Sequence, residues 1–394
     1  MPSLPTDNFK EFVSLHAKDD PRQLLLKCHG KDFGFDVEQA ITQIECRKKC
    51  DRKLKSFIEN PDFLFPNVLA AEQASHEAVA KFHASLLSSG SSVLDMTAGL
   101  GIDAMTIASK SSVTAIELDE WKAKVLDYNS KAEGLKGFSV VNADSVEWLK
   151  NHPDCYNVIF IDPARRGADN SRTYNLHDCQ PDILGVLPEV LEKCGKLIIK
   201  ASPLLDITQT LTDIPQAFSI RAVSVDGECK EVLVEATARP LGPVLAEAVN
   251  LSSDGDIIFR FGYMIGASGG EVNFASDSDI KTESYLYEPD ASVMKLAPWP
   301  ELTARFTGLR KLGKSTHLFV SDLLYPDFPG RVTRITGVPD KKSLKGIKAN
   351  VVTRNYPLPP ESLRKKFNIK EGKDTFLYGV KAGEKPMLIL SERV

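Results

Sequence analysis

The sequence predicts an α/β protein built on a mostly parallel sheet, with a helical region before it and a small α+β unit after it. From residue 91 onward, short apolar runs alternate with stretches of helical periodicity. The apolar runs are nearly continuous, as in parallel strands that are covered on both faces. A glycine pair, Gly99 and Gly101, directly follows the first run. This order of strand, glycine turn and helix is typical of a nucleotide-binding sheet.

The region before the sheet, residues 1–88, is expected to be helical. Residues 36–60 repeat apolar side chains at helical spacing, with Ile41, Ile44 and Leu54 among them. The segment PDFLFP, residues 61–66, breaks this pattern, and residues 67–87 resume it. With 394 residues the chain is too long for one ordinary core, so we expect further domains.

The central domain is expected at residues 89–240. Its strands are predicted at 92–96, 112–118, 138–144, 156–162, 196–201, 218–225 and 231–237. The first five alternate with helical stretches and should be parallel. Only DGECK separates the last two, which predicts an antiparallel hairpin at the edge of the sheet.

The character of the chain changes after Pro240. We expect connecting strands and a small unit at 241–320, with a Gly/Ser/Asp-rich linker at 267–279, and a further α+β domain at 321–394. Between Glu301 and Val394 there are 19 Lys and Arg residues against 9 Asp and Glu residues, so this segment carries +10 while the first 300 residues carry −14. The split indicates an anionic partner for the C-terminal part, or only a solvated basic surface.

Composition places the protein among soluble globular proteins of the cytoplasm. Hydrophobic residues make up 42% and charged residues 26%, and no apolar run approaches the length of a membrane span. The N-terminus lacks the order of a signal peptide. The seven scattered cysteines are expected to be reduced thiols, and no metal site is predicted.

Acidic residues end three successive predicted strands. Asp95 ends the first, Glu117 the second and Asp144 the third. Glu117 follows Gly99 by 18 residues, close to the ~20 expected of a carboxylate that holds ribose hydroxyls. Although GLGIDA also fits a dinucleotide fingerprint, a carboxylate at Asp95 would repel a pyrophosphate and attract a cation. S-adenosylmethionine, with its sulfonium and ammonium groups, fits such a site.

The segments DMTAGLG, IELD, NAD and IDPARR together resemble class I S-adenosylmethionine-dependent methyltransferases. With KASPLLD, VDGECKE and the tail NYPLPPESLRKKFNIKEGKDTFLYG, the chain resembles a bacterial subfamily that has a DPARR motif and a THUMP-like C-terminal domain. The resemblance implies a Rossmann-like seven-stranded methyltransferase sheet and a ferredoxin-like/THUMP-like C-terminal unit. It also implies cofactor contacts from Asp95, Thr97, Gly99, Gly101, Asp103, Glu117, Leu118, Asn142, Ala143, Asp144 and Asp162.

The acceptor is expected beyond the fourth strand, at IDPARRG. Asp162 would orient the acceptor or take its proton, and Arg165 with Arg166 would clamp a phosphate or simply fix the loop. Lys200 and Ser202, at the end of the fifth strand, are further pocket candidates. Asp162, Arg165 and Lys200 form the predicted catalytic set. Glu72, Gln73 and Ser75 would cover the cofactor by resemblance, or lie on a helix surface.

Two familiar chemistries fit this segment poorly. Methyltransferases of planar amino nitrogens carry D/N-P-P and an aromatic residue, whereas Ala164 and Arg165 stand here. RNA 5-methyluridine methyltransferases carry D-P-P-R and need a nucleophilic cysteine at the end of the fifth strand, where this chain has Lys200-Ala201-Ser202.

The favoured function is methyl transfer from S-adenosylmethionine to RNA, which the basic C-terminal unit would bind. This unit has two clusters of basic residues, one formed by Lys341, Lys342, Lys345 and Lys348 and the other by Arg364, Lys365 and Lys366. Alternatives are a methyltransferase of a protein or small molecule and a non-catalytic cofactor- or RNA-binding module. An NAD-dependent oxidoreductase ranks last because of Asp95. The oligomeric state is not predicted.

Overall fold

The computed structural model describes residues 4–165, 176–240, 242–267, 270–340 and 342–394. The chain forms two compact units, and each is described separately. Unit 1 comprises Met1–Asp226, Lys230–Val244 and Leu251–Ile258, and unit 2 comprises Gly227–Cys229, Leu245–Asn250 and Phe259–Val394.

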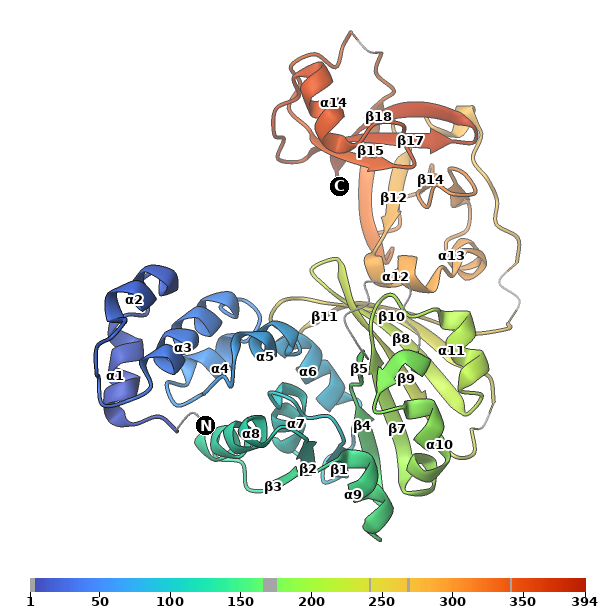
Figure 1. Ribbon diagram of the computed structural model, residues 1–394. Helices are drawn as coiled ribbons and strands as arrows, with labels where there is room; N and C mark the ends of the chain where they lie inside the picture. Colours follow the sequence, from blue (N-terminus) through green and yellow to red (C-terminus); the bar gives the residue numbers. More distant parts are fainter. Residues whose placement is uncertain (1–3, 166–175, 241, 268–269, 341) are drawn as a thin grey trace. The chain divides into compact units, whose positions relative to one another are not determined.

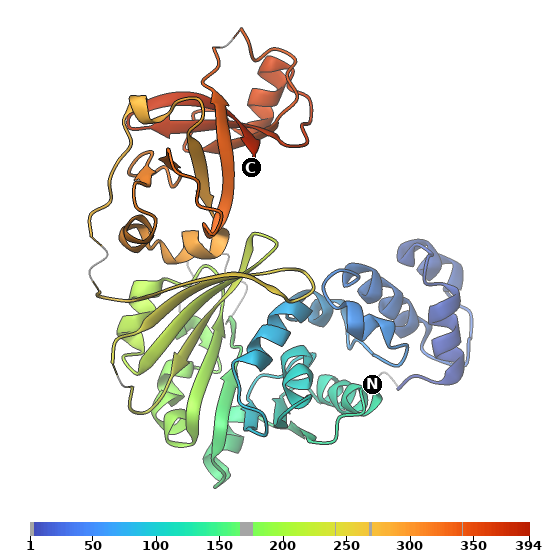
Figure 2. The ribbon, with the colours of Figure 1, turned by 180° about the vertical axis from the view of Figure 1, so that it is seen from behind.

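Unit 1 begins with the helices drawn in blue in Figure 1 and, seen from behind, in Figure 2. They are α1 (Asp7–Leu15), α2 (Pro21–Cys28), α3 (Val37–Lys49), α4 (Lys55–Glu59), α5 (Val68–Gln73) and α6 (Glu77–Ser85). The Asp36 side chain caps α3 by accepting the backbone N–H of Gln39. Apolar faces of α1 to α3 pack with Val125 of α8 (Glu120–Ala132) in one buried cluster. The predicted N-terminal helical region is therefore confirmed, and it is attached to the sheet domain through α8.

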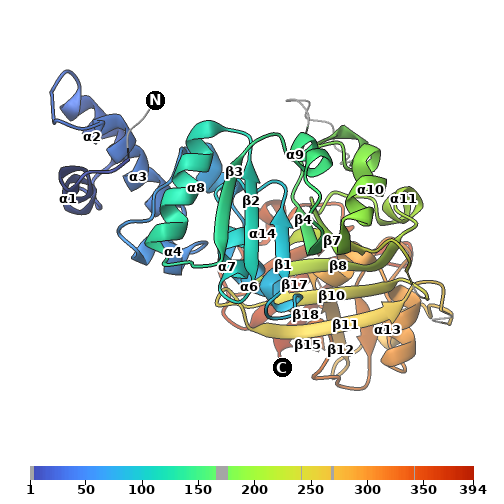
Figure 3. The ribbon, with the colours of Figure 1, turned by 90° about the horizontal axis from the view of Figure 1, so that it is seen from below.

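The sheet has nine strands in the order β11-β10-β8-β9-β7-β4-β1-β2-β3. Its strands are β1 (Ser92–Asp95), β2 (Ser112–Glu117), β3 (Phe138–Asn142), β4 (Tyr156–Ile161), β7 (Cys194–Ala201), β8 (Ala217–Val225), β9 (Glu228–Ala236), β10 (Leu245–Leu251) and β11 (Ile257–Met264). β3, β2, β1, β4 and β7 are parallel, as predicted, and lie side by side in Figure 3. The order reverses at β1, so the carboxyl ends of β1 and β4 form a crevice.

Helices connect the parallel strands, as the alternation predicts. They are α7 (Ile102–Ala108), α8, α9 (Ser145–Asn151) and α10 (Ile183–Glu192), and α11 (Ile207–Asp213) follows β7 and leads to β8. After β4 the chain forms the short pair β5 (Ala164–Arg165) and β6 (Cys179–Gln180), with the 3₁₀ turn η1 (Leu176–Asp178) just before β6. This antiparallel pair joins the two ends of the long segment that follows β4.

The prediction that the β8–β9 hairpin lies at the edge of the sheet was wrong. All seven predicted strands are present, and β9 pairs antiparallel with β7, but β10 and β11 extend the sheet beyond β8. β10 and β11 were predicted as strands of the connecting region, but the sequence pattern of a strand does not determine the sheet to which it belongs.

Unit 2 contains a second sheet, in the order β13-β14-β12-β15-β18-β17-β16. Its elements are η2 (Asp277–Asp279), β12 (Tyr285–Pro289), α12 (Ala291–Leu296), α13 (Trp299–Arg305), β13 (Arg310–Lys311), β14 (Phe319–Ser321), β15 (Gly330–Gly337), β16 (Asn350–Arg354), α14 (Pro360–Phe367), β17 (Thr375–Ala382) and β18 (Lys385–Arg393). β16 and β17 are parallel and α14 connects them. One core lies around Leu286, Val320 and Tyr378, and another packs Leu363 and Phe367 of α14. The predicted α+β unit is confirmed.

None of the helices in the described part of the chain has the length and hydrophobicity needed to span a lipid bilayer. The seven cysteines are free thiols.

Candidate functional site

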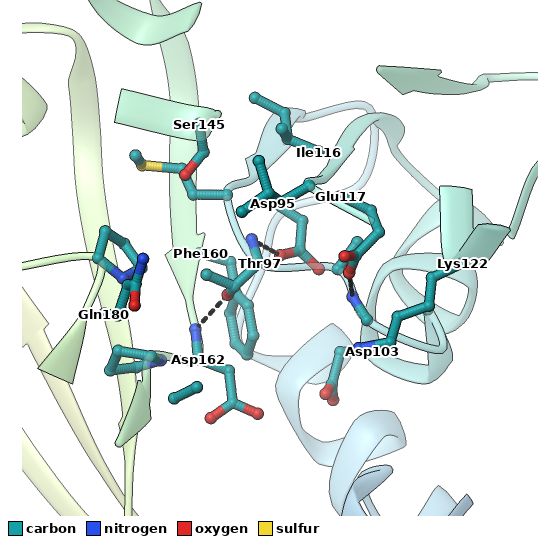
Figure 4. Close-up of a pocket in the computed structure, with 18 of the residues that line it drawn as sticks. Asp95, Thr97, Asp103, Ile116, Glu117, Lys122, Ser145, Phe160, Asp162 and Gln180 are labelled. Carbon is teal, nitrogen blue, oxygen red and sulfur yellow. Dashed lines mark hydrogen bonds between the residues drawn. The ribbon is translucent and has the colours of Figure 1, made fainter. Parts of the chain in front are cut away.

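A cavity of about 990 Å³ lies at the carboxyl ends of β1, β2, β3 and β4 (Figure 4). Ten of the residues predicted to contact a cofactor line it: Asp95, Thr97, Gly99, Gly101, Asp103, Glu117, Leu118, Ala143, Asp144 and Asp162. Gln73, Ala74 and Ser75 from the end of α5 line it as well, and Gln180 to Asp182 lie on the side of the β5–β6 pair. The cavity is large enough for a nucleoside-sized ligand.

The glycine turn after β1 brings backbone close to the cavity. Gly101 is the N-terminal cap of α7 with φ +87°, and a Cβ there would lie 2.1 Å from Cδ1 of Leu126. Gly99 has φ +56°, a conformation that favours glycine. Its N–H donates to Oε2 of Glu117 at 3.0 Å (Figure 4), so the turn and the end of β2 hold each other.

Glu117 is fixed in place but keeps acceptor capacity. Oε2 accepts from Gly99, and Oε1 accepts the N–H of Asp119 at 2.9 Å. A carboxylate has about four lone-pair positions, so two N–H partners leave room for two ligand hydroxyls. Asn142 is not among the described lining residues. Instead, its Nδ2 donates to the carbonyl oxygens of Glu117 and Leu118, both at 2.9 Å, and shapes the turn that carries Glu117.

Asp144 ends the β3 segment as the N-terminal cap of α9. Its Oδ1 accepts the N–H groups of Val146 and Glu147, each at 2.9 Å. The cap fixes the carboxylate at the wall of the cavity, beside Ala143 and Ser145. A polar amino group of a ligand can be bound there.

Asp95 is buried at the tip of β1, with 2% of its surface exposed. Its Oδ1 accepts the N–H of Thr97 at 2.9 Å, and Oγ1 of Thr97 accepts the N–H of Asp162 at 2.7 Å, so Thr97 connects the ends of β1 and β4. Burial raises the pKa of Asp95 to about 8, although the Thr97 N–H opposes this; Asp103 and Asp162 raise it further. A cationic ligand would favour the ionised form of this carboxyl group.

Lys200 on β7 lies between two carboxylates. Its Nζ is 2.5 Å from Oδ2 of Asp162 and 3.8 Å from Oδ2 of Asp103, and it donates to Oγ of Ser75 at 2.7 Å. Burial alone would lower the pKa of Lys200, but Asp162 and then Asp103 hold it well above its usual value. The lysine is therefore a cation that orients Asp162, and it is not a base.

His83 and Glu231 complete this cluster, and neither was predicted as a site residue, although Glu231 ends the segment VDGECKE. Nδ1 of His83 is 2.7 Å from Oδ1 of Asp103, and Nε2 is 2.5 Å from Oε1 of Glu231. Burial alone would lower the pKa of His83, but Glu231 and Asp103 raise it to about 10. Asp103 lines the cavity, but its carboxylate accepts hydrogen bonds from the His83 ring and the Ser75 hydroxyl. These bonds are made within the cluster.

The remaining predicted residues lie as follows. Arg165 belongs to β5, but its side chain, like the whole of Arg166, lies outside the described residues. Ser202 accepts the N–H of Leu204 and is not among the described lining residues. Glu72 forms an exposed ion pair with Lys49, as expected of helix surface, whereas Gln73 and Ser75 line the cavity.

The basic charge of unit 2 is partly paired. Arg331 and Arg354 both reach Glu288, and Arg310 pairs with Asp279. In contrast, no ion pair of the described residues involves the basic cluster at the end of α14, formed by Arg364, Lys365 and Lys366. In the other predicted cluster, Lys342, Lys345 and Lys348 are described and Lys341 is not.

Comparisons with known proteins match both units. Family models for a ferredoxin-like domain and for a THUMP domain-like module match residues 285–329 and 337–393. A solved candidate methyltransferase from Porphyromonas gingivalis W83 is 26% identical, with a TM-score of 0.84 over 98% of this chain and 97% of that chain. The predicted fold class is thus confirmed over nearly the whole chain.

A curated relative is an uncharacterised RNA methyltransferase of Mycoplasma mobile. It is 26% identical over 158 residues, which are 39% of this chain and 43% of that protein. The match therefore spans less than half the length of the relative.

Proposed function

We propose that this protein is an S-adenosylmethionine-dependent methyltransferase that acts on RNA. The observation that carries the proposal is the convergence of Asp95, Glu117 and Asp144 on one cavity, together with the backbone of Gly99. Three carboxylates from successive strands suit a ligand that carries a cationic amino acid, a ribose and an adenine.

The residues of the cavity fit each part of this cofactor. Glu117 retains acceptor positions for two ribose hydroxyls, and Asp144 would accept the adenine amino group. Leu118 lines the cavity with 64% of its surface exposed, and a planar base would cover it. The carboxyl group of Asp95 would attract the cationic amino-acid end of the cofactor. Position 101 requires glycine, because a Cβ there would clash with the side chain of Leu126. When bound, the cofactor supplies an activated methyl group with its own leaving group.

Asp162 would face the acceptor. It follows β4 directly, its backbone is held by Thr97 and its carboxylate by Lys200, and 39% of its side chain is exposed. The protein would supply alignment for an in-line displacement, which is the main contribution that such a reaction needs. A fixed carboxylate can orient a hydroxyl or amino acceptor by its proton and can take that proton as the methyl arrives.

RNA is proposed as the substrate because a THUMP domain-like module and a basic surface occur in the same unit. The DPARR subfamily assignment, a cytoplasmic location and the domain limits 1–88, 89–240, 241–320 and 321–394 belong to the same proposal. Binding of RNA to the basic unit would be dominated by phosphate contacts.

The experiment is incubation of the purified chain with cofactor carrying an isotope-labelled methyl group and, in separate reactions, total RNA, total protein or a small-molecule extract from a strain that lacks the gene. Label in RNA, absent with Asp162→Ala, supports the proposal. Label in protein or a small metabolite, but not in RNA, would favour the second candidate, a methyltransferase of those substrates. That candidate is supported by the −14 charge of the first 300 residues, which an RNA would have to approach.

A further inference from the structure

A chain of alternating charges runs from the interior of unit 1 to the candidate site. It consists of Glu231 on β9, His83 on α6, Asp103 on α7, Lys200 on β7 and Asp162 after β4. The exposed fraction of the side chains rises along it, from 2% and 0% through 11% and 13% to 39%. The inner end is thus sealed from water, and the outer end is the carboxylate that would meet the acceptor.

The geometry requires a doubly protonated His83. A neutral imidazole has one N–H and one lone pair, but both ring nitrogens lie within 2.7 Å of a carboxylate oxygen, from Asp103 on one side and Glu231 on the other. A lone pair against a buried carboxylate would be strongly unfavourable. His83 therefore contributes a fixed positive charge between two negative ones.

The ammonium group of Lys200 is near two carboxylates, and it contacts that of Asp162. Its Nζ is 2.5 Å from Asp162 and 3.8 Å from Asp103. Asp103 is already satisfied, because Oδ1 contacts the His83 ring and Oδ2 accepts the hydroxyl of Ser75. The attraction that Asp103 exerts on Lys200 is reduced by the charge of His83.

We propose that His83 is a positioning residue for methyl transfer: its imidazolium neutralises Asp103, so that Lys200 remains on Asp162 and holds that carboxylate toward the acceptor. The inference rests on the proposed function as far as turnover is concerned, but its structural part does not. Loss of the charge on His83 should draw Lys200 from Asp162 to Asp103 and leave Asp162 free to rotate.

A purely structural role for His83 makes a different prediction. A buried ion pair that loses one partner destabilises the fold, but it need not change turnover of the molecules that remain folded. With a purely structural role, the further change Asp103→Asn, which removes the competing negative charge, would not raise turnover above that of His83→Gln. The double variant His83→Gln with Asp103→Asn separates the two roles, because Lys200 again has Asp162 as its nearest carboxylate.

The test compares the wild-type chain, His83→Gln and His83→Gln/Asp103→Asn, each below its melting temperature. Cofactor affinity is measured by calorimetry, turnover by transfer of labelled methyl to total RNA from the deletion strain, and the Nζ–Oδ2 distances by crystallography. We expect His83→Gln to lose roughly tenfold or more in kcat with cofactor Kd changed by less than about threefold, and the double variant to regain most of that loss.

The inference would be overturned by wild-type turnover in His83→Gln, or by a crystal structure of that variant with Nζ of Lys200 still in contact with Asp162. A double variant as slow as the single one would do the same. If the wild-type chain labels no RNA, the proposed substrate fails, and the position of Lys200 in the His83→Gln crystal still decides the inference.

Discussion

Nζ of Lys200 lies 2.5 Å from Oδ2 of Asp162, and the backbone N–H of the same aspartate donates to Thr97. The carboxylate that follows β4 is therefore held both through its side chain and through its main chain. One contact comes from β7 and the other from the turn after β1. This links the cofactor half of the candidate site to its acceptor half.

Asp162→Ala should abolish most methyl transfer while the cofactor still binds. The variant removes the group that orients the acceptor but leaves Glu117 and Asp144 in place, so kcat should fall far more than cofactor affinity. Single-turnover assays and calorimetry on the same preparation measure the two quantities. Asp154→Ala, an exposed change just before β4, is the matched control and should match the wild type in both. An active Asp162→Ala would reduce that residue to a loop anchor.

Glu117→Ala should weaken S-adenosylmethionine binding by about 1–3 kcal/mol, because it removes a charged hydrogen-bond acceptor. It also removes the acceptor of the Gly99 N–H, so the glycine turn should become less ordered. Glu120→Ala changes an exposed residue that pairs with Lys124 along α8, and it should bind like the wild type. Equal affinity of Glu117→Ala and wild type, measured by calorimetry, would contradict the placement of the ribose.

The charge of His83 should make stability depend on pH. Its pKa in the folded chain is about 10, above its ordinary value of 6.5, so its contribution is complete below pH 6.5 and is lost as the pH rises through about 10. Over that window the unfolding free energy should fall by about 1.4 kcal/mol per pH unit more in the wild type than in His83→Gln. Asp95, with a pKa of about 8, adds a similar fall below pH 8 to both proteins and cancels in the comparison.

Urea denaturation of both proteins across this pH range measures the difference. Two carboxylates face His83. Burial alone would raise the pKa of Asp103, but Lys200 and His83 hold it well below its ordinary value, so in the wild type it adds no slope in this window. The other carboxylate is that of Glu231. Parallel curves for the two proteins would mean that His83 is neutral in the folded chain.

The basic cluster at the end of α14 should contribute to RNA affinity through phosphate contacts. Replacement of Arg364, Lys365 and Lys366 by alanine should flatten the slope of log K against log salt by roughly two units, at about 0.7–0.9 per contact. Alanine at the exposed Lys18, Lys27 and Lys31 of the N-terminal helical region removes the same charge elsewhere and should change the slope less. Filter binding with tRNA over a salt series gives both slopes, and identical slopes would show a merely solvated surface.

The cofactor side of the site could be predicted because its signals are local. Asp95, Glu117 and Asp144 each follow an apolar run, and parallel strands bring their carboxyl ends to one edge whatever the rest of the chain does. Gly99 and Gly101 stand where a tight turn is needed, and both have positive φ. Five parallel strands and their helices followed from the same periodicities.

The His83 cluster could not be predicted in this way. His83 and Glu231 are 148 positions apart, and the segment VDGECKE, which ends at Glu231, does not indicate that this glutamate is buried beside a histidine. Ser75 was equally consistent with helix surface, and only the packing of α5 against the site decides in favour of the cavity. In the same way β10 and β11 were predicted as strands, but the sequence pattern does not determine which strand they pair with.

The most direct test of the central claim is mass spectrometry of nucleosides after RNA from the deletion strain has been incubated with the wild-type chain and cofactor carrying a deuterated methyl group. We expect one nucleoside that carries the deuterated methyl, that is missing with Asp162→Ala, and that occurs unlabelled in RNA of the parent strain. Deuterium absent from every nucleoside, with calorimetry showing that the same preparation binds the cofactor, would contradict the assignment to RNA.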